Sequence, residues 1–327
     1  MESFAYARPT TQSEALGHLS SSFEDSAVLA GGTDILSLMK NYVVAPKRLV
    51  DIRGVKDFAG ITRNAGGARI GATVTLQELA DDSGMQKDFP GLVAAASGVP
   101  SMQIRNMGTV GGDLLQRPRC WYFRNGFGLL ARDAKGHALV PGGDNRYHAI
   151  LGNEGPAYFV NPSSLAPMLI ALGASVEISG GKGTRKVELA KFFRAPRNEH
   201  EREYTLAANE IVTAVVIPEG AANWKTASYE VREKQALDWP LATASVALRV
   251  EGGTVREARI VMGHVAPIPW PSPVAAHALA GKQISEESAA KAGEAAVQNA
   301  HPLSGNKYKV QLARVAVKRA ILAAGRA

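Results

Sequence analysis

The chain has 327 residues, a length that suggests two or three domains. Hydrophobic residues make up 46% and charged residues 20% of it, which argues against disorder, and no apolar run approaches the roughly 18 residues that a membrane span needs. The one cysteine, Cys120, excludes an internal disulfide and a cluster held by cysteines alone, and the net charge of +7 is scattered over every segment, which disfavours a nucleic-acid site.

The first part of the chain, to about residue 56, has the pattern of a small α/β unit. Thr11 and Glu14 form a capping box, which predicts the start of a helix. In chain order we expect a helix from this box to about Leu19, a strand at 27–30, a helix at 35–40 and a strand at 48–52. Gly31 to Asp34 should form a turn that separates the strand at 27–30 from the helix at 35–40.

The middle part, from about 57 to 218, predicts a strand at 69–72, a helix after the Thr75 capping box, a helix at 91–97, a strand at 158–160, a helix from Ser163 or Ser164 to Leu172, and strands at 175–178 and 210–217. Residues 103–113 are too rich in glycine for a helix and too polar for a buried strand. Residues 117–157 read as a long loop, which is uncommon and usually functional.

The last part changes character after Pro218. Two β-rich runs, 243–250 and 254–261, are separated by a Glu-Gly-Gly hairpin signal. Two helices should follow, one capped by Ser285 and one over about 306–324. We therefore place the domains at 1–218, with subdomains of about 1–56 and 57–218, and at 219–327.

Two glycine motifs have a composition that suits anion binding. They are Ala30–Asp34, between a strand and a helix, and Thr109–Asp113. Glycines let the backbone approach a phosphate, and free N–H groups in such turns point at the anion. Each motif alone also fits an ordinary tight turn, and neither is a Rossmann or P-loop pattern. Two such loops suit a dinucleotide held between two subdomains.

The motifs AGGTD and RNMGTVGGDLLQ, together with FAYARPTTQSEAL, RLVDI, IGATVTLQEL, EIVTAVVIP and SYEVREKQALDWPLATASVAL, resemble the flavoprotein subunits of the xanthine dehydrogenase and carbon monoxide dehydrogenase family. The resemblance covers nearly the whole chain in order. It implies an α+β fold, with a two-subdomain FAD-binding domain of the vanillyl-alcohol-oxidase type before a small α+β C-terminal domain.

The resemblance also assigns cofactor contacts. The residues that it places at FAD are Leu29, Ala30, Gly31, Gly32, Thr33, Asp34, Ile35, Leu36, Thr109, Gly111, Gly112, Asp113, Ser164, Ile211 and Arg232. Arg232 is either the family's basic residue near the isoalloxazine, where a cation would stabilise reduced flavin, or an ordinary surface residue. Trp239 packs near the ring or, as the favoured alternative, is a core aromatic.

Two departures from the family pattern stand out. Gln116–Arg124 matches the QR-x-RC-x-YFR signature of the periplasmic aldehyde oxidoreductase flavoproteins, whose following insertion carries cysteines for a four-iron four-sulfur cluster. Here only Cys120 remains, so we expect no such cluster, and apolar packing of Trp121, Phe123, Phe127, Leu129 and Leu130 should hold the loop instead. Ser164 also stands where the family has a ribose-binding carboxylate.

The implied function is an FAD-binding electron-transfer subunit of a molybdenum hydroxylase. A large partner would hold the molybdenum cofactor, and a small one the two-iron two-sulfur clusters that pass electrons to this FAD and on to an external acceptor. We expect no catalytic residue or metal ligand in this chain, no nucleic-acid or membrane partner, and a cytoplasmic location unless a signal-bearing partner exports it. The alternatives are a stand-alone FAD-dependent oxidase and a non-catalytic assembly subunit.

Overall fold

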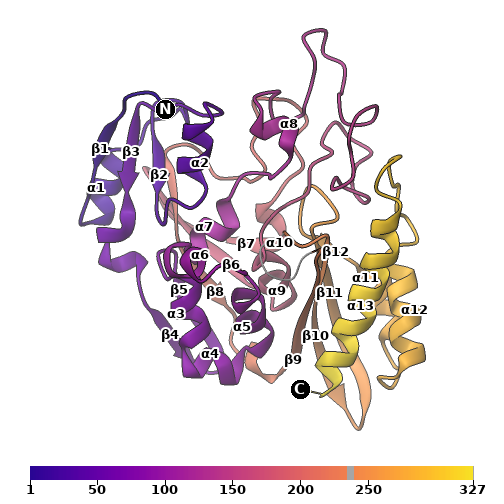
Figure 1. Cartoon of the computed structure of the whole chain (residues 1–327). Helices are drawn as coiled ribbons and strands as arrows, with labels where there is room; N and C mark the ends of the chain where they lie inside the picture. The colour runs from indigo at the N-terminus through magenta and orange to yellow at the C-terminus, as the bar shows by residue number, and fades with distance from the viewer. Residues whose placement is uncertain (234–238, 327) are drawn as a thin grey trace.

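The computed structural model describes residues 1–233 and 239–326, which form three β-sheets with helices around them (Figure 1). The N-terminal sheet is parallel, in the order β1-β3-β2. Its strands and helices are β1 (Ala5–Ala7), α1 (Gln12–Gly17), β2 (Ala27–Leu29), α2 (Ile35–Lys40) and β3 (Arg48–Asp51). The capping box at Thr11 is confirmed, because its hydroxyl accepts from the Glu14 amide.

The second sheet is antiparallel, with the order β4-β5-β8-β6-β7. Its strands are β4 (Ile61–Asn64), β5 (Gly67–Gly71), β6 (Ser175–Gly180), β7 (Gly183–Glu188) and β8 (Glu210–Ile217). Helices α3 (Leu76–Asp81), α4 (Ser83–Asp88), α5 (Pro90–Ser97), α6 (Met102–Met107), α7 (Val110–Leu115), α8 (Trp121–Arg124), α9 (Ala166–Ala171) and α10 (Leu189–Phe192) belong to this part. The main core lies between sheet and helices, around side chains such as Phe89, Leu92 and Phe192.

The third sheet, β12-β11-β10-β9, is antiparallel and carries the C-terminal helices on one face (Figure 1). Its elements are β9 (Lys225–Val231), β10 (Ala242–Glu251), β11 (Thr254–Gly263), β12 (Trp270–Pro271), α11 (Pro273–Leu279), α12 (Glu286–Ala296) and α13 (Tyr308–Arg326). Gly293 lets α12 approach α13 closely, since a Cβ there would lie 2.5 Å from the Arg314 carbonyl oxygen.

Two predictions from sequence were wrong. Residues 103–113 are not a loop, because they contribute to the two short helices α6 and α7, which the Ser101 and Thr109 hydroxyls cap. Glycine costs a helix only about 1 kcal/mol per residue, which capping and packing outweigh here. Residues 158–160 form no strand, because their neighbourhood makes only isolated backbone bonds, such as Ala149 N–H to the Tyr158 carbonyl.

Residues 117–157, here called the insertion, run over the top of the molecule in Figure 1. The last helix holds the end of this segment. The buried Lys309 ammonium donates to the carbonyl oxygens of Tyr147, His148 and His264 at 3.1, 3.0 and 2.8 Å. Asn306 Nδ2 also donates to the His148 carbonyl at 3.1 Å. The conformation of the insertion therefore depends on residues far along the chain.

Candidate functional site

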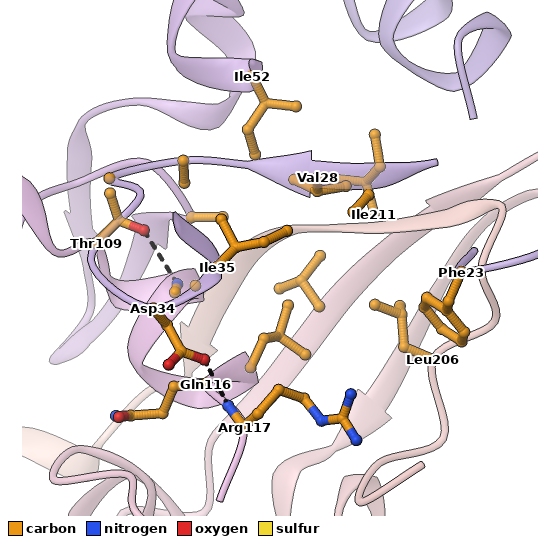
Figure 2. A pocket seen from close by; sticks show the side chains of 18 of the residues that line it. Phe23, Val28, Asp34, Ile35, Ile52, Thr109, Gln116, Arg117, Leu206 and Ile211 are labelled. Atoms are coloured by element: carbon orange, nitrogen blue, oxygen red, sulfur yellow. Dashed lines mark hydrogen bonds between the residues drawn. The ribbon is translucent and has the colours of Figure 1, made fainter. Parts of the chain in front are cut away.

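A cleft with a volume of about 190 Å³ lies between the N-terminal sheet and the second sheet (Figure 2). We call it the main cleft. Both glycine turns reach it, the first with residues 30–34 and the second with Thr109, Gly111 and Gly112. Ile35 and Ile211 line it as well, and Figure 2 shows Ile211 beside Val28 on the apolar side.

The first glycine turn presents its backbone to the cleft. Strand β2 ends at Leu29 and helix α2 begins at Ile35, while Gly32 has a φ of +74°, which favours glycine. Among the described residues, none accepts a hydrogen bond from the main-chain N–H groups of residues 31–34. A row of N–H donors without protein acceptors, beside an open cleft, is suited to an anion such as a pyrophosphate.

The first turn touches the backbone at the end of α6, just before the second turn. A Cβ on Gly31 would lie 1.7 Å from the Met107 carbonyl oxygen, so no other residue fits there. Leu29 and Leu36 are not part of the cleft lining, because they pack with Met39 and Leu49 in the cluster beneath the turn. They support the turn from the side that faces away from the cleft.

The second glycine turn has few free donors. Gly111 N–H donates to the Ala72 carbonyl at 2.9 Å, and Gly112 N–H donates to Thr109 Oγ1 at 3.0 Å. A Cβ on Gly111 would lie 2.9 Å from that of Ala72. These glycines let α7 lie close against the end of β5, which brings Thr109 and Gly112 to the wall of the cleft.

Asp34, the carboxylate of the first turn, is bound by the insertion. It accepts from the Arg117 N–H at 2.8 Å, from Arg124 Nη2 at 2.8 Å, and forms an ion pair with Arg119 at 3.3 Å. Figure 2 shows the first of these bonds. The two guanidinium groups offset a negative charge that would otherwise repel an anion in the main cleft.

Asp113, the carboxylate of the second turn, is buried and caps another element. Its oxygens accept from Ser163 Oγ at 2.5 Å and from the N–H groups of Ser164 and Leu165 at 3.3 and 3.0 Å. Burial raises the pKa of this carboxyl although these donors oppose the shift. Asp113 thus ties α7 to the start of α9 and does not line the main cleft.

A second hollow of about 110 Å³ adjoins the main cleft and shares Thr33, Asp34, Thr109 and Gly112 with it. We call it the Arg232 hollow, because Arg232 lines it together with Ser164 and Asp113. The Arg232 guanidinium bonds to Glu230 and to the Gly98 carbonyl, and burial raises the pKa of the Glu230 carboxyl. Arg232 is therefore a half-buried residue paired with Glu230, and not an ordinary surface residue.

Trp239 also lines the Arg232 hollow and is 43% exposed, which excludes its interpretation as a core aromatic. The Arg119 guanidinium lies over its ring, 4.3 Å from the centroid. The site prediction missed other lining residues, namely Phe23, Gln116, Arg117, Arg202 and Leu206. Gln116 and Arg117 open the QR-x-RC-x-YFR signature, which could have identified them. Phe23, Arg202 and Leu206 come from segments without a motif, and no local sequence signal identifies them.

The apolar residues of the insertion are only partly packed together. Phe123, Leu129 and Leu130 are buried in a cluster with Leu38 and Phe159, whereas Phe127 is 49% exposed. Cys120 Sγ lies 3.2 Å from His148 Nε2, and burial raises the pKa of its thiol. Within residues 1–233 and 239–326, no group of three or more His, Cys, Asp or Glu side chains could hold a metal ion.

None of the helices in the described residues is both long and apolar enough to span a bilayer.

Residues 2–220 match the family model described as the FAD binding domain in molybdopterin dehydrogenase. Residues 227–324 match the CO dehydrogenase flavoprotein C-terminal domain.

Relatives that align with almost the whole chain are named as subunits of the same kind of enzyme. The chain is 31% identical to the aldehyde oxidoreductase FAD-binding subunit PaoB of Escherichia coli K12, over 96% of each chain. It is 29% identical to the carbon monoxide dehydrogenase medium chain of Hydrogenophaga pseudoflava, over 98% of this chain and 96% of that one. Its structure matches a carbon monoxide dehydrogenase structure from the same organism with a TM-score of 0.77 and 28% identity, covering 99% of this chain and 97% of that chain.

Proposed function

Because the chain belongs to the family of FAD-binding subunits of molybdenum hydroxylases, we propose that its main cleft and Arg232 hollow hold one FAD between them. The observation that carries this assignment is the set of main-chain N–H groups at 31–34 that have no acceptor among the described residues. A pyrophosphate supplies acceptors for these donors. The anion would lie where the two glycine turns meet, with Thr33 and Thr109 hydroxyls on either side.

The two hollows differ in chemistry, which suggests how the two halves of FAD are arranged. The main cleft is largely apolar around Val28, Ile52 and Ile211 and suits the flat adenine. The Arg232 hollow is lined by the guanidinium of Arg232, which suits the electron-rich end of a reduced isoalloxazine. Ser164 lines this hollow and can offer one hydroxyl where the family has a carboxylate.

Bound FAD supplies the ability to take up electrons and release them to a different acceptor. This chain's residues bind and orient the cofactor, and none of them is proposed as a catalytic acid or base. Partners would be a large subunit with the molybdenum cofactor and a small subunit with two-iron two-sulfur clusters, in keeping with relatives whose names call them medium chains. The chain would receive electrons from the small subunit and pass them to an external acceptor.

The domain limits of 1–218 and 219–327 and a cytoplasmic location remain part of this proposal. A stand-alone oxidase would require a substrate site beside the flavin within this chain. A non-catalytic assembly subunit would not need the free N–H donors of the first glycine turn. The relatives named as subunits and the open turn both favour the electron-transfer role.

The test is co-purification followed by an absorption spectrum. A tagged chain expressed with its neighbouring genes should bring down two further subunits, and the complex should show flavin absorbance that acid releases. A chain that purifies alone, binds FAD and turns over a substrate would favour the stand-alone oxidase. A chain in the complex without flavin would favour the assembly role.

A further inference from the structure

On the wall of the main cleft, the Arg202 guanidinium lies over the Phe23 ring, 4.1 Å from its centroid. Phe23 belongs to the segment between α1 and β2, beside the N-terminal sheet, whereas Arg202 belongs to the segment between α10 and β8, beside the second sheet. Both side chains are half-buried, and both line the cleft. The contact therefore connects the two sides of the cleft, and we call it the Phe23–Arg202 clasp.

The clasp lies away from the two glycine turns. Figure 2 shows Phe23 and Leu206 toward one end of the cleft, and Asp34 and Thr109 toward the other. Asp34 and Thr109 also line the Arg232 hollow, where we place the flavin ring. The clasp is therefore on the far side of the proposed pyrophosphate from the flavin ring, and the part of FAD that reaches this end is the adenine.

Arg202 differs from the other charged residues of the cleft in having no ionic partner. The charged residues on the lining are Asp34, Arg117, Arg202 and Glu210. The other three form ion pairs with residues outside the lining, at distances of 2.7 to 2.8 Å. Within residues 1–233 and 239–326, no carboxylate forms an ion pair with Arg202. Its guanidinium, held against the Phe23 ring, remains available to a ligand.

The segment that carries Arg202 is fixed on both sides. Glu203, the next residue, is buried and pairs with Arg117 at 2.7 Å. Glu199 accepts hydrogen bonds from two main-chain N–H groups of the insertion, at 2.7 and 2.9 Å. The Arg194 N–H donates to the Glu203 carbonyl at 3.0 Å. Arg202 is thus held in place before a ligand binds, which lowers the entropy that binding costs.

A flat purine suits this end of the cleft. Nucleobases stack on aromatic rings and on the planes of arginine guanidinium groups, and the clasp offers one of each. Leu206 and Ile211 line the same cleft and give the base apolar surroundings. A second phosphate is less suited to this end, because the free main-chain donors lie at the first glycine turn.

We propose that the Phe23–Arg202 clasp stacks on the adenine of FAD and makes this chain select FAD over FMN. The inference rests on the proposed function, since it requires FAD in the main cleft. FMN has the flavin ring and one phosphate but no adenine, so it leaves the clasp unoccupied. Phe23 and Arg202 are therefore specificity-determining residues for the cofactor.

The experiment uses the full chain, freed of flavin by dialysis against potassium bromide. FAD and FMN are titrated separately, and quenching of flavin fluorescence gives each Kd. Arg202→Gln should weaken FAD binding about tenfold, as expected for the loss of one stacking partner of a base, and should change the Kd of FMN little. Arg197→Gln is the matched control, because it removes the same charge from an exposed position in the same segment. It should change neither Kd.

Phe23→Leu is the second variant, since it keeps an apolar side chain and removes the aromatic face. It should also weaken FAD and spare FMN, and melting temperatures of the flavin-free chains identify a folding defect. If FMN binds too weakly to titrate, ADP competition replaces it, and ADP should lose affinity by the same factor as FAD because it carries the adenine.

Selective loss of FAD affinity in both clasp variants supports the proposal. Unchanged FAD affinity would overturn it. Equal losses for FAD and FMN would overturn it as well, because they would place the effect at the phosphate or the flavin ring. A wild-type chain that binds no FAD would instead overturn the proposed function.

Discussion

Arg124, in the insertion, donates a hydrogen bond from Nη2 to Asp34 Oδ1 in the first glycine turn, across a distance of 2.8 Å. The two side chains are only 13% and 16% exposed. Arg119 and the Arg117 N–H bind the same carboxylate. The insertion is therefore anchored on the turn that we propose to bind the pyrophosphate. A substitution in the turn or in the insertion should affect the structure of the other.

Asp34→Asn should destabilise the fold and weaken FAD binding, because it leaves two largely buried guanidinium groups without their counter-charge. We expect a loss of roughly 2–3 kcal/mol, slightly less than for a fully buried pair. Urea unfolding of the wild type and the variant measures it. Asp25→Asn is the control, since its partner Lys47 is 80% exposed, and it should cost far less than Asp34→Asn. Equal losses would show that the Asp34 contacts are not stabilising.

Gly32→Asp should abolish FAD binding. The new carboxylate would stand among N–H donors meant for a pyrophosphate, and Gly32 also has a φ of +74°, which strains any other residue. Gly281→Asp is the matched control, because Gly281 has the same φ of +74° but open space around it, far along the chain. Flavin content after purification is the measurement. Full flavin content in Gly32→Asp would contradict the proposed position of the pyrophosphate.

Gly112→Asp tests the second turn separately. A Cβ there meets only Thr109 Oγ1, at 3.0 Å, so the backbone can tolerate the change while the cleft wall gains a negative charge. We expect loss of flavin with little change in the melting temperature. Gly142→Asp, in open space within the insertion, should keep its flavin. If both variants retain FAD, Gly112 does not face the cofactor.

The insertion should carry no iron. Cys120 is its single thiol, and His148 beside it uses Nε2 toward Cys120 Sγ, so the usual set of about four ligands is lacking. Cys120→Ser should leave flavin content unchanged. Iron analysis of anaerobically prepared chain, separated from partners, is the direct measurement, and about four irons per chain would show that the interpretation is wrong.

The isolated chain should oxidise neither aldehydes nor purines, because the proposed molybdenum and two-iron sites lie on partner subunits. Substrate-dependent flavin reduction under anaerobic conditions is the measurement, with dithionite as a positive control for a reducible flavin. Reduction by an aldehyde with the chain alone, free of molybdenum, would favour the stand-alone oxidase.

Protonation of the Asp51 carboxylate should lower the stability of the N-terminal sheet in acid. Burial would raise its pKa, but hydrogen bonds from Arg53 and Tyr6 outweigh this and lower the pKa from 3.8 to about 2. The stabilisation, about 2 kcal/mol, is thus complete above pH of about 4 and is lost as pH falls toward 2. Asp51→Asn should cost this amount at neutral pH and much less in acid. Asp144→Asn, at an exposed pair, should show little pH-dependent difference.

Local signals allowed much of the fold to be predicted. The capping boxes at Thr11 and Thr75 and the cap at Ser285 begin helices, because the same few residues contain both donor and acceptor. The hairpin at residues 252–253 is also confirmed. Its signal is local too, because Gly252 and Gly253 have φ of +55° and +77°, as such a turn requires. Strand β1 was missed, as its three residues are stabilised by pairing with β3, which lies far along the chain.

The site could be predicted only in part. The resemblance brought Gly31, Gly32, Thr109 and Gly112 together, and the structure places all four at the main cleft. The partners of Asp34 in the insertion and the pairing of Arg232 with Glu230 depend on tertiary contacts that no spacing of residues reveals. The requirement for glycine at position 31 is likewise explained by the Met107 carbonyl oxygen at the end of α6, not by the ligand.

The Lys309 contacts also affect the order in which the chain can fold during synthesis. Residues 147 and 148 leave the ribosome long before residue 309, yet their carbonyl oxygens accept from the Lys309 ammonium in the finished structure. A chain grows at roughly 5–20 residues per second, so these carbonyl groups wait roughly 8–30 seconds for this partner. The insertion is therefore the last part of the FAD-binding half to become ordered, and a truncated translation product cannot complete it.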